Sequence, residues 1–298
     1  MIARNKNIVI TGGNNGLGKA IALQLAEEKN NIFFTYCSDD KSATETVREI
    51  SKLGVRVKAL KVNFLNEASV KLLVEKSYEF FDGEVDVLVN NAGIICRKPL
   101  FEITEKDWDD THNVNTKTPF FLLQQFGKKM QEKQLQRIQK AYKEKGIEIT
   151  DKLLNSSAKL SLLADYCIVF ITSISRNVFT GLLPYEVSKA GTHGIVGAAA
   201  SDPSLSYFQI RVNEVAPGLI ATNLNKHIWM HQPNLWQQRA SSIPLGFTGE
   251  PADVAKAVSS IISNKWMNGT TMTVDGGRSH NFIGSDLKQQ ASILKSKL

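Results

Sequence analysis

The chain has 298 residues, of which 42% are hydrophobic and 22% charged, as in an ordinary globular protein. No run approaches the roughly 18 consecutive apolar residues that span a bilayer, and MIARNKNIVITGG does not read as a cleavable signal peptide. Cys37, Cys96 and Cys167 lack the spacing of a zinc site or disulfide framework, so we expect no metal and a reducing, cytoplasmic setting. The net charge of +7 is dispersed and accompanies no nucleic-acid motif, so we expect neither a nucleic-acid nor a membrane partner.

Short apolar or β-branched runs alternate with longer amphipathic stretches along the chain. The alternation predicts an α/β fold in which a seven-stranded parallel sheet is covered by helices on both faces, with its ligand crevice at the carboxyl ends of the strands. We expect a single domain over residues 1–298. The expected strands are Asn7–Thr11, Ile32–Tyr36, Val57–Val62, Val85–Asn90, Cys167–Ser173, Ile210–Ala216 and Thr270–Val274. The expected helices are Leu17–Glu28, Lys41–Leu53, Glu67–Phe81, Trp108–Lys129, Tyr185–Ala200 and Pro251–Ser263.

One stretch departs from this alternation. Residues 131–165 are polar and helix-prone, with one glycine and no proline, and they predict a continuation of the preceding helix followed by a second short helix. They lead into the amino end of the fifth strand, opposite the expected crevice. We therefore expect this insertion to alter surface or subunit contacts and not the chemistry. The tail after Gly277 is longer than the fold requires, and we expect it to be an oligomer contact or disordered.

A glycine-rich turn, TGGNNGLG, joins the first strand to the first helix. Glycines also serve ordinary tight turns, but at this junction they let the backbone approach a pyrophosphate. The helix N-terminus then supplies unpaired N–H groups and a partial positive charge. The turn therefore predicts a dinucleotide-binding, doubly wound Rossmann fold. The residues expected to contact the cofactor here are Gly12, Asn14, Asn15, Gly16, Leu17 and Gly18.

The spacing TGxxxGxG resembles that of the short-chain dehydrogenase/reductase family. Further motifs follow in the family's order, from about residue 6 to residue 277, interrupted by the insertion and by a small irregularity at residues 202–209. The resemblance implies an NAD(P)(H)-dependent oxidoreductase that transfers a hydride between the nicotinamide and a carbonyl or secondary alcohol. The motifs are NNAG at Asn90–Gly93, YEVSK at Tyr185–Lys189, PG at Pro217–Gly218 and DGG at Asp275–Gly277.

Tyr185 and Lys189 are four residues apart and so share one face of a helix. A free tyrosine has a pKa of about 10, and a nearby ammonium favours the phenolate. We expect Lys189, with the cationic nicotinamide, to lower the pKa of Tyr185 enough for proton transfer at neutral pH. An ordinary helix can carry this pair by chance, but the nucleotide turn favours chemistry. The resemblance implies that Ser173 binds the substrate oxygen and that Asn115 anchors a water chain linking Lys189 to solvent.

The end of the second strand bears on the choice of nicotinamide. NAD-preferring relatives place an acidic residue there, about 20 residues after the glycines, to bind the ribose hydroxyls. Tyr36 occupies that position, and the absence of a carboxylate there permits a 2′-phosphate, which Ser38 can contact. Cys37 stands where NADP-linked relatives often carry an arginine, which would bind the 2′-phosphate better. We expect NADP(H) to be favoured over NAD(H). The resemblance implies further cofactor contacts from Asn63, Phe64, Asn91, Ala92, Gly93, Tyr185, Lys189, Pro217, Gly218, Ile220 and Thr222.

The substrate is less constrained. Residues 223–242 match the family's variable lid and include Arg239. The tryptophans and histidines of this segment either stack on a sugar, line an apolar cleft or anchor the lid to the body. Arg97 and Lys98 either face an acidic substrate or lie on the surface. IPLGFTGEPADVAKAV is similar to 3-oxoacyl carrier-protein reductases, our first expectation. NNAGII followed by basic residues, with EKDWDD, resembles gluconate-type sugar-acid dehydrogenases, so the alternative is a sugar or sugar-acid dehydrogenase.

A hypothesis of another class is a non-catalytic dinucleotide-binding sensor or scaffold. Inactive relatives typically lack the tyrosine or lysine, whereas all four expected catalytic residues are present here. The resemblance also implies a homo-oligomer, a tetramer or dimer, formed through the helices Trp108–Lys129 and Tyr185–Ala200. The insertion and the interruption at Asp202–Pro203 depart from the pattern of the standard tetramer.

Overall fold

The computed structural model describes residues 5–144 and 163–280. Seven parallel strands form one sheet in the order β3-β2-β1-β4-β5-β6-β7, which confirms the doubly wound fold predicted from the sequence. The strands are β1 (Asn7–Ile10), β2 (Asn31–Tyr36), β3 (Val57–Lys61), β4 (Val87–Asn90), β5 (Tyr166–Ile171), β6 (Ile210–Pro217) and β7 (Thr271–Val274).

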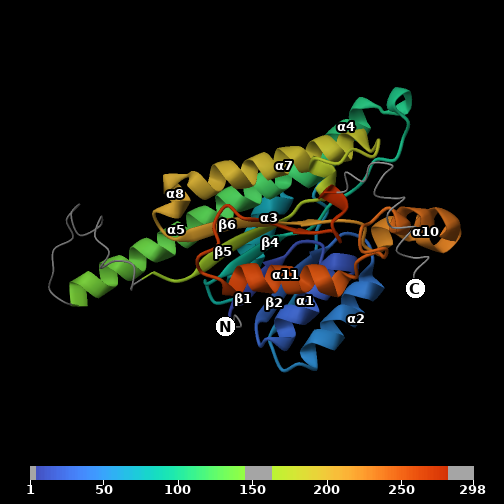
Figure 1. Ribbon diagram of the computed structural model, residues 1–298. Helices are drawn as coiled ribbons and strands as arrows, with labels where there is room; N and C mark the ends of the chain where they lie inside the picture. Colours follow the sequence, from blue (N-terminus) through green and yellow to red (C-terminus); the bar gives the residue numbers. More distant parts are fainter. Residues whose placement is uncertain (1–4, 145–162, 281–298) are drawn as a thin grey trace, which may run out of the picture.

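Helices cover both faces of the sheet (Figure 1). On one face lie α1 (Gly16–Glu27), α2 (Asp40–Ser51) and α11 (Pro251–Ser263). On the other lie α3 (Ser69–Phe80), α5 (Thr118–Glu144) and α7 (Leu183–Ser201). Among the described residues, no helix combines the length and hydrophobicity that a membrane crossing requires.

Strand β1 shows why the apolar runs are continuous. Its side chains alternate in direction, so Ile8 and Ile10 enter the core beneath α1, whereas Val9 enters the core on the opposite face. All three are fully buried. Burying such a side chain stabilises the fold by about 1.5–3 kcal/mol, so a sheet with two covered faces requires apolar residues at consecutive positions.

The helix between β4 and β5 is interrupted, whereas the sequence pattern predicts one continuous helix. Thr104 and Asp107 form a capping box that starts α4 (Glu105–His112) before Trp108. A π-helical turn, η2 (Asn113–Lys117), then joins α4 to α5. Such turns are local distortions of a helix, often found at functional sites.

The first part of the insertion continues α5 to Glu144, as expected. Gln134 is buried and donates hydrogen bonds to the carbonyl oxygens of Ala164 and Phe208, which fixes this end of the helix beside the start of β5. Figure 1 shows this end of α5 and helix α10 (Pro233–Ser241) on opposite sides of the molecule. The expected second short helix falls on residues 145–162, which lie outside the described residues. Of the tail after Gly277, only residues 278–280 are described, and they form the turn η6 (Arg278–His280).

Candidate active site

The turn between β1 and α1 is shaped by glycines that no larger residue can replace without strain. Gly12 and Gly16 have φ values of +67° and +52°, which other L-residues rarely adopt. A Cβ on Gly18 would lie 2.0 Å from the carbonyl oxygen of Gly12, so α1 packs directly on the turn. Asn15 precedes α1 without capping it through its side chain, which leaves the first-turn N–H groups available to an anion.

Thr11 and Asn91 hold this turn against the end of β4. The Asn91 Nδ2 donates to the carbonyl oxygens of Thr11 and Gly12, at 2.8 and 3.0 Å. The Thr11 Oγ1 accepts from the backbone N–H groups of Asn91 and Ala92, each at 2.9 Å. Sequence reasoning did not single out Thr11, although its place at the strand end beside the first glycine was a usable signal.

A cavity of about 570 Å³ extends from this turn over the carboxyl ends of the strands. Four residues expected to contact the cofactor do not line this cavity. A neighbouring cavity is lined by Pro217, Gly218 and Ile220, and Ser38 lines neither cavity. The residues expected to hold the cofactor that line the first cavity are Gly12, Asn14, Asn15, Gly16, Leu17, Gly18, Tyr36, Asn63, Phe64, Asn91, Ala92, Gly93, Tyr185, Lys189 and Thr222. Thr35, Cys37 and Val62, which the sequence did not suggest, also line it.

Tyr36, at the end of β2, lines the first cavity, and polar side chains lie beside it. Tyr36 donates its hydroxyl hydrogen to Asp40 at 2.9 Å, and Lys61 pairs with the same carboxylate at 2.8 Å. Asp39 accepts from the backbone and hydroxyl of Ser42 and so caps α2. Both carboxylates thus have partners within the protein.

The structure brings Ser173, Tyr185 and Lys189 together where the strand ends meet α7. Tyr185 is 8% exposed, near the start of the helix, and Ser173 follows β5. Lys189, one turn after Tyr185, places its Nζ 5.7 Å from the centroid of the tyrosine ring. The same Nζ donates to the carbonyl oxygen of Ile171 at 2.8 Å.

Burial dominates the electrostatics of this group. It raises the pKa of Tyr185, while hydrogen bonding with Ser173 and the positive charge of Arg97 oppose the rise. Burial also lowers the pKa of Lys189 to about 8, against the opposing charge of Glu214. The expectation that Lys189 lowers the pKa of Tyr185 is therefore not met by the residues alone. The ammonium lies against a backbone carbonyl and is itself easily deprotonated.

Asn115 connects the loop after β4 to α7 from within the π-helical turn. Its Nδ2 donates to the carbonyl oxygen of Ile94 at 2.9 Å and to Ser188 Oγ at 3.0 Å, and its Oδ1 accepts from the Ile94 N–H. The Ser188 hydroxyl donates in turn to the carbonyl oxygen of Tyr185. A Cβ on Gly93 would lie 3.3 Å from Asn115 Oδ1 and 3.7 Å from the Lys189 Nζ, so a larger side chain at residue 93 would crowd both groups.

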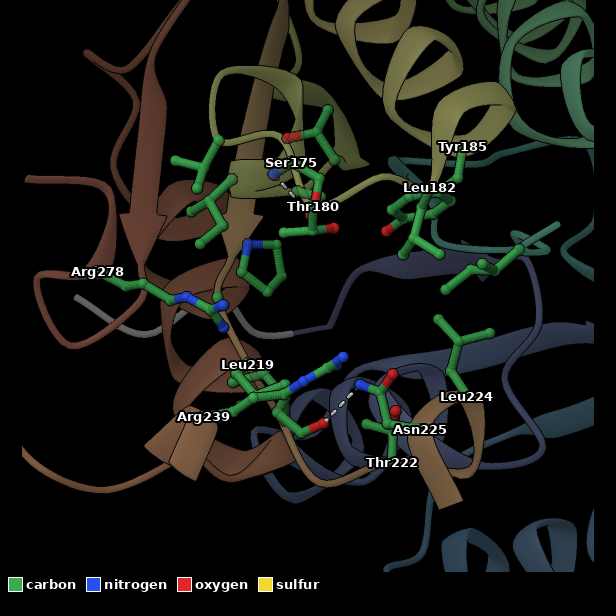
Figure 2. Close-up of a pocket in the computed structure, with 18 of the residues that line it drawn as sticks. Ser175, Thr180, Leu182, Tyr185, Leu219, Thr222, Leu224, Asn225, Arg239 and Arg278 are labelled. Carbon is green, nitrogen blue, oxygen red and sulfur yellow. Dashed lines mark hydrogen bonds between the residues drawn. The ribbon is translucent and has the colours of Figure 1, made fainter. Parts of the chain in front are cut away.

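A second cavity, of about 210 Å³, adjoins the first and is also lined by Tyr185 (Figure 2). Of the expected lid residues, Arg239 on α10 lines it, whereas Trp229 donates to the carbonyl oxygen of Thr222 and so anchors the lid. Arg97 lines it as well and donates to the carbonyl oxygen of Leu224. Lys98 instead pairs with Asp107. The lid comprises η5 (Asn223–Asn225), α9 (Lys226–His231) and α10.

Comparison with known proteins agrees with this geometry. Residues 6–138 match a family model described as short chain dehydrogenase, and residues 156–279 match one described as Enoyl-(Acyl carrier protein) reductase. The 3-oxoacyl-(acyl-carrier-protein) reductase FabG of Staphylococcus epidermidis is 32% identical over 276 residues, which cover 92% of this chain and 98% of the relative.

Solved structures give the same result. The acetoin dehydrogenase of Enterobacter cloacae is 26% identical, with a TM-score of 0.74 over 94% of this chain and 100% of the other. An Agrobacterium tumefaciens protein described as a 2-deoxy-D-gluconate 3-dehydrogenase, solved with bound NADP, is 27% identical, with a TM-score of 0.74 over 94% of this chain and 98% of the other.

The fold and site define a dinucleotide-dependent oxidoreductase. The chain belongs to the short-chain dehydrogenase/reductase family and transfers a hydride between NAD(P)(H) and a carbonyl or secondary alcohol.

Proposed function

We propose that this enzyme reduces a small carbonyl substrate with NADPH, or oxidises the corresponding alcohol with NADP⁺, using Tyr185 as the proton donor and acceptor. The observation that carries the proposal is that Tyr185 lines both cavities, with Ser173 and Lys189 beside it. A substrate in the smaller cavity would thus meet the phenol and a cofactor in the larger one at the same point.

The larger cavity fits a dinucleotide, because Gly12, Gly16 and Gly18 line it without side chains beside the N-terminus of α1. The first turn of α1 would hold the pyrophosphate, Asn63 the adenine, and Ile220 and Thr222 the carboxamide. When bound, NAD(P)(H) supplies or accepts the hydride at the reacting carbon.

Each catalytic side chain has a distinct proposed task. During reduction, Tyr185 donates its hydroxyl proton to the substrate oxygen while the Ser173 hydroxyl binds the same oxygen and fixes its position. The ammonium of Lys189 stabilises the phenolate that remains. Asn115 keeps the loop after β4 in contact with α7 and, as in the family, would anchor water that returns the proton to Lys189.

The preference for NADP(H) is supported by the end of β2. Tyr36 stands where NAD-preferring relatives carry an acid, and the nearby Asp40 is neutralised by Lys61. We expect Tyr36→Asp to raise KM for NADPH at least about tenfold and to leave KM for NADH unchanged or lower, because a carboxylate there repels the 2′-phosphate. Steady-state kinetics with both cofactors measure this. An unchanged NADPH/NADH ratio in the variant would show that the residue does not select the cofactor.

Two substrate classes are compatible with the relatives. The reductase of S. epidermidis supports a 3-oxoacyl substrate, and the A. tumefaciens structure supports a sugar acid. Loss of NADPH absorbance in the presence of a panel of both classes tests turnover. Binding of NADPH without reduction of any carbonyl would favour the sensor hypothesis. We further propose a homo-oligomer in the cytoplasm.

A further inference from the structure

Three arginines from distant parts of the chain line the smaller of the two cavities that Tyr185 lines. Arg97 lies in the loop after β4, Arg239 on α10 and Arg278 in the turn η6 (Arg278–His280). Figure 2 shows Arg239 and Arg278 reaching into the cavity from its lower left side, with Tyr185 across from them. The lining residues include no aspartate or glutamate.

The three guanidinium groups lack the partners that other arginines of this chain have. Arg176 and Arg211 each pair with a carboxylate. Arg97 donates only to neutral oxygens, those of Leu224 and Asn225. Within residues 5–144 and 163–280, the side chains of Arg239 and Arg278 form neither an ion pair nor a hydrogen bond.

The positive charge of Arg239 repels those of Arg97 and Arg278. Burial and the neighbouring Arg239 lower the pKa of both Arg97 and Arg278. Like charges held together in a partly buried cavity raise the free energy of the folded protein unless an anion lies between them. The arrangement is therefore complementary to a negative group that the described residues do not provide.

The cofactor does not account for this anion. None of the three arginines lines the larger cavity, whose phosphate-binding turn lies at α1. They surround the smaller cavity, where Ser173 and Tyr185 would meet the reacting carbonyl. At about 210 Å³, that cavity suits a small molecule better than a long chain.

We infer that the substrate is a small anionic oxo or hydroxy compound, whose carboxylate or phosphate is bound by Arg97, Arg239 and Arg278 while its reacting group contacts Ser173 and Tyr185. This inference rests on the proposed function. Reduction adds a hydride from NADPH to the carbonyl carbon and the Tyr185 proton to its oxygen, so the arginines and the anion keep their charges. Of the two substrate classes above, the inference favours the sugar acid, because a 3-oxoacyl thioester carries no charge at its reacting end.

Matched substrates test the inference by kinetics. We expect kcat/KM to be at least about tenfold higher for 5-oxo-D-gluconate than for D-fructose, or for dihydroxyacetone phosphate than for dihydroxyacetone. The pair that shows the larger ratio distinguishes a carboxylate from a phosphate.

Variants of the arginines test the same inference. Arg239→Gln or Arg278→Gln should lower kcat/KM for the anionic substrate of the pair by roughly 10- to 100-fold, chiefly through KM, and leave kcat/KM for the neutral substrate nearly unchanged. Arg48→Gln, on the exposed face of α2, is the matched control and should change neither.

A binding measurement tests the charge requirement without turnover. D-Gluconate should raise the Tm of the wild-type protein more than D-sorbitol does, or inorganic phosphate should raise it more than chloride at equal ionic strength, and Arg239→Gln should abolish the difference. Equal kcat/KM within both substrate pairs, or no anion-specific rise in Tm, would overturn the inference and leave the proposed reaction intact. If the enzyme reduced no carbonyl with either cofactor, the proposed function would be contradicted. The Tm comparison would still show whether the arginines bind an anion.

Discussion

The charge of Lys189 should make the proposed reduction depend on pH. Its pKa is lowered by burial to about 8, so it is an ammonium below that pH and neutral above it. Because the proposed reduction leaves a phenolate that this ammonium stabilises, kcat for reduction should fall as pH rises through about 8. Glu214→Gln removes the opposing charge and should move the fall to lower pH, whereas Glu49→Gln on the surface should not. A reduction rate that is constant from pH 7 to about 10 would contradict this role.

The same depressed pKa affects folding. The ordinary lysine pKa is 10.5, so between about pH 8 and 10.5 the unfolded chain binds more protons than the folded one, and stability from this group rises with pH. Lys189→Met should therefore stabilise the protein below pH 8, by at most about 3 kcal/mol, less the lost hydrogen bond to Ile171. The gain should shrink toward pH 10.5. Urea unfolding at two pH values measures it, and a gain that grows with pH would refute the argument.

At the residue scale, the sequence was sufficient to predict that Tyr185, Lys189 and Ser173 lie close together, because their spacing follows from one helix and the end of one strand. It was insufficient for the electrostatics. Burial of Tyr185 raises its pKa, an effect that depends on the lid and neighbouring strands and not on spacing. Arg97 and Arg239 are 142 residues apart in the sequence (239 − 97) and converge only because the loop after β4 and helix α10 lie over the same cavity.

At the scale of single elements, the turn before α1 gives the clearest test. Gly18→Ala would place a Cβ against the backbone oxygen of Gly12, so the turn must open. We expect the Kd for NADPH to rise more than about tenfold, equivalent to about 1.4 kcal/mol. Fluorescence titration with NADPH measures the Kd. Unaltered binding would show that close packing of α1 on the turn is not needed.

Gly197→Ala is the matched control. Gly197 lies on the exposed side of α7, where an added Cβ would have no neighbouring atom within 4 Å. Alanine should stabilise the helix by roughly 0.5–1 kcal/mol and leave the Kd for NADPH unchanged.

The elements themselves were largely predictable. The strands were placed to within two residues because both faces of the sheet are buried, so apolar runs stop where the sheet stops. The π-helical turn at Asn113–Lys117 was not predicted, because it depends on contacts of Asn115 with Ile94 and Ser188, which are distant in sequence. The lid was predicted as a segment but not as three short helices, since its sequence has no sustained periodicity.

At the scale of the whole molecule, the end of α5 should matter for stability and not for catalysis. Arg137 pairs with Glu84 at 2.8 Å and donates to the Tyr166 hydroxyl, beside the amino end of β5 and away from the site. Arg137→Met should lower the free energy of unfolding by about 1–2 kcal/mol, while kcat/KM stays within about twofold. Lys140→Met, which removes only an exposed pair, should change neither. A large loss of kcat/KM in Arg137→Met would show that this end of the molecule reaches the site.

The proposed oligomer can also be tested. Phe120 and Phe121 on α5 and Val187 on α7 are large apolar side chains that are more than a third exposed. Phe120→Glu should reduce the mass measured by light scattering, because a charge in an apolar interface is costly. Trp266→Glu, at an exposed site beyond α11, should not. A monomeric wild-type protein would contradict the oligomer.

The central claim is that the Tyr185 hydroxyl supplies the proton for carbonyl reduction. Tyr185→Phe removes that hydroxyl and keeps the ring, so it tests the claim directly. With the carbonyl that the wild-type enzyme reduces fastest, kcat should fall by about 10²- to 10⁴-fold while the Kd for NADPH stays within about twofold. Turnover by Tyr185→Phe at the wild-type rate, with the cofactor bound equally well, would contradict the account.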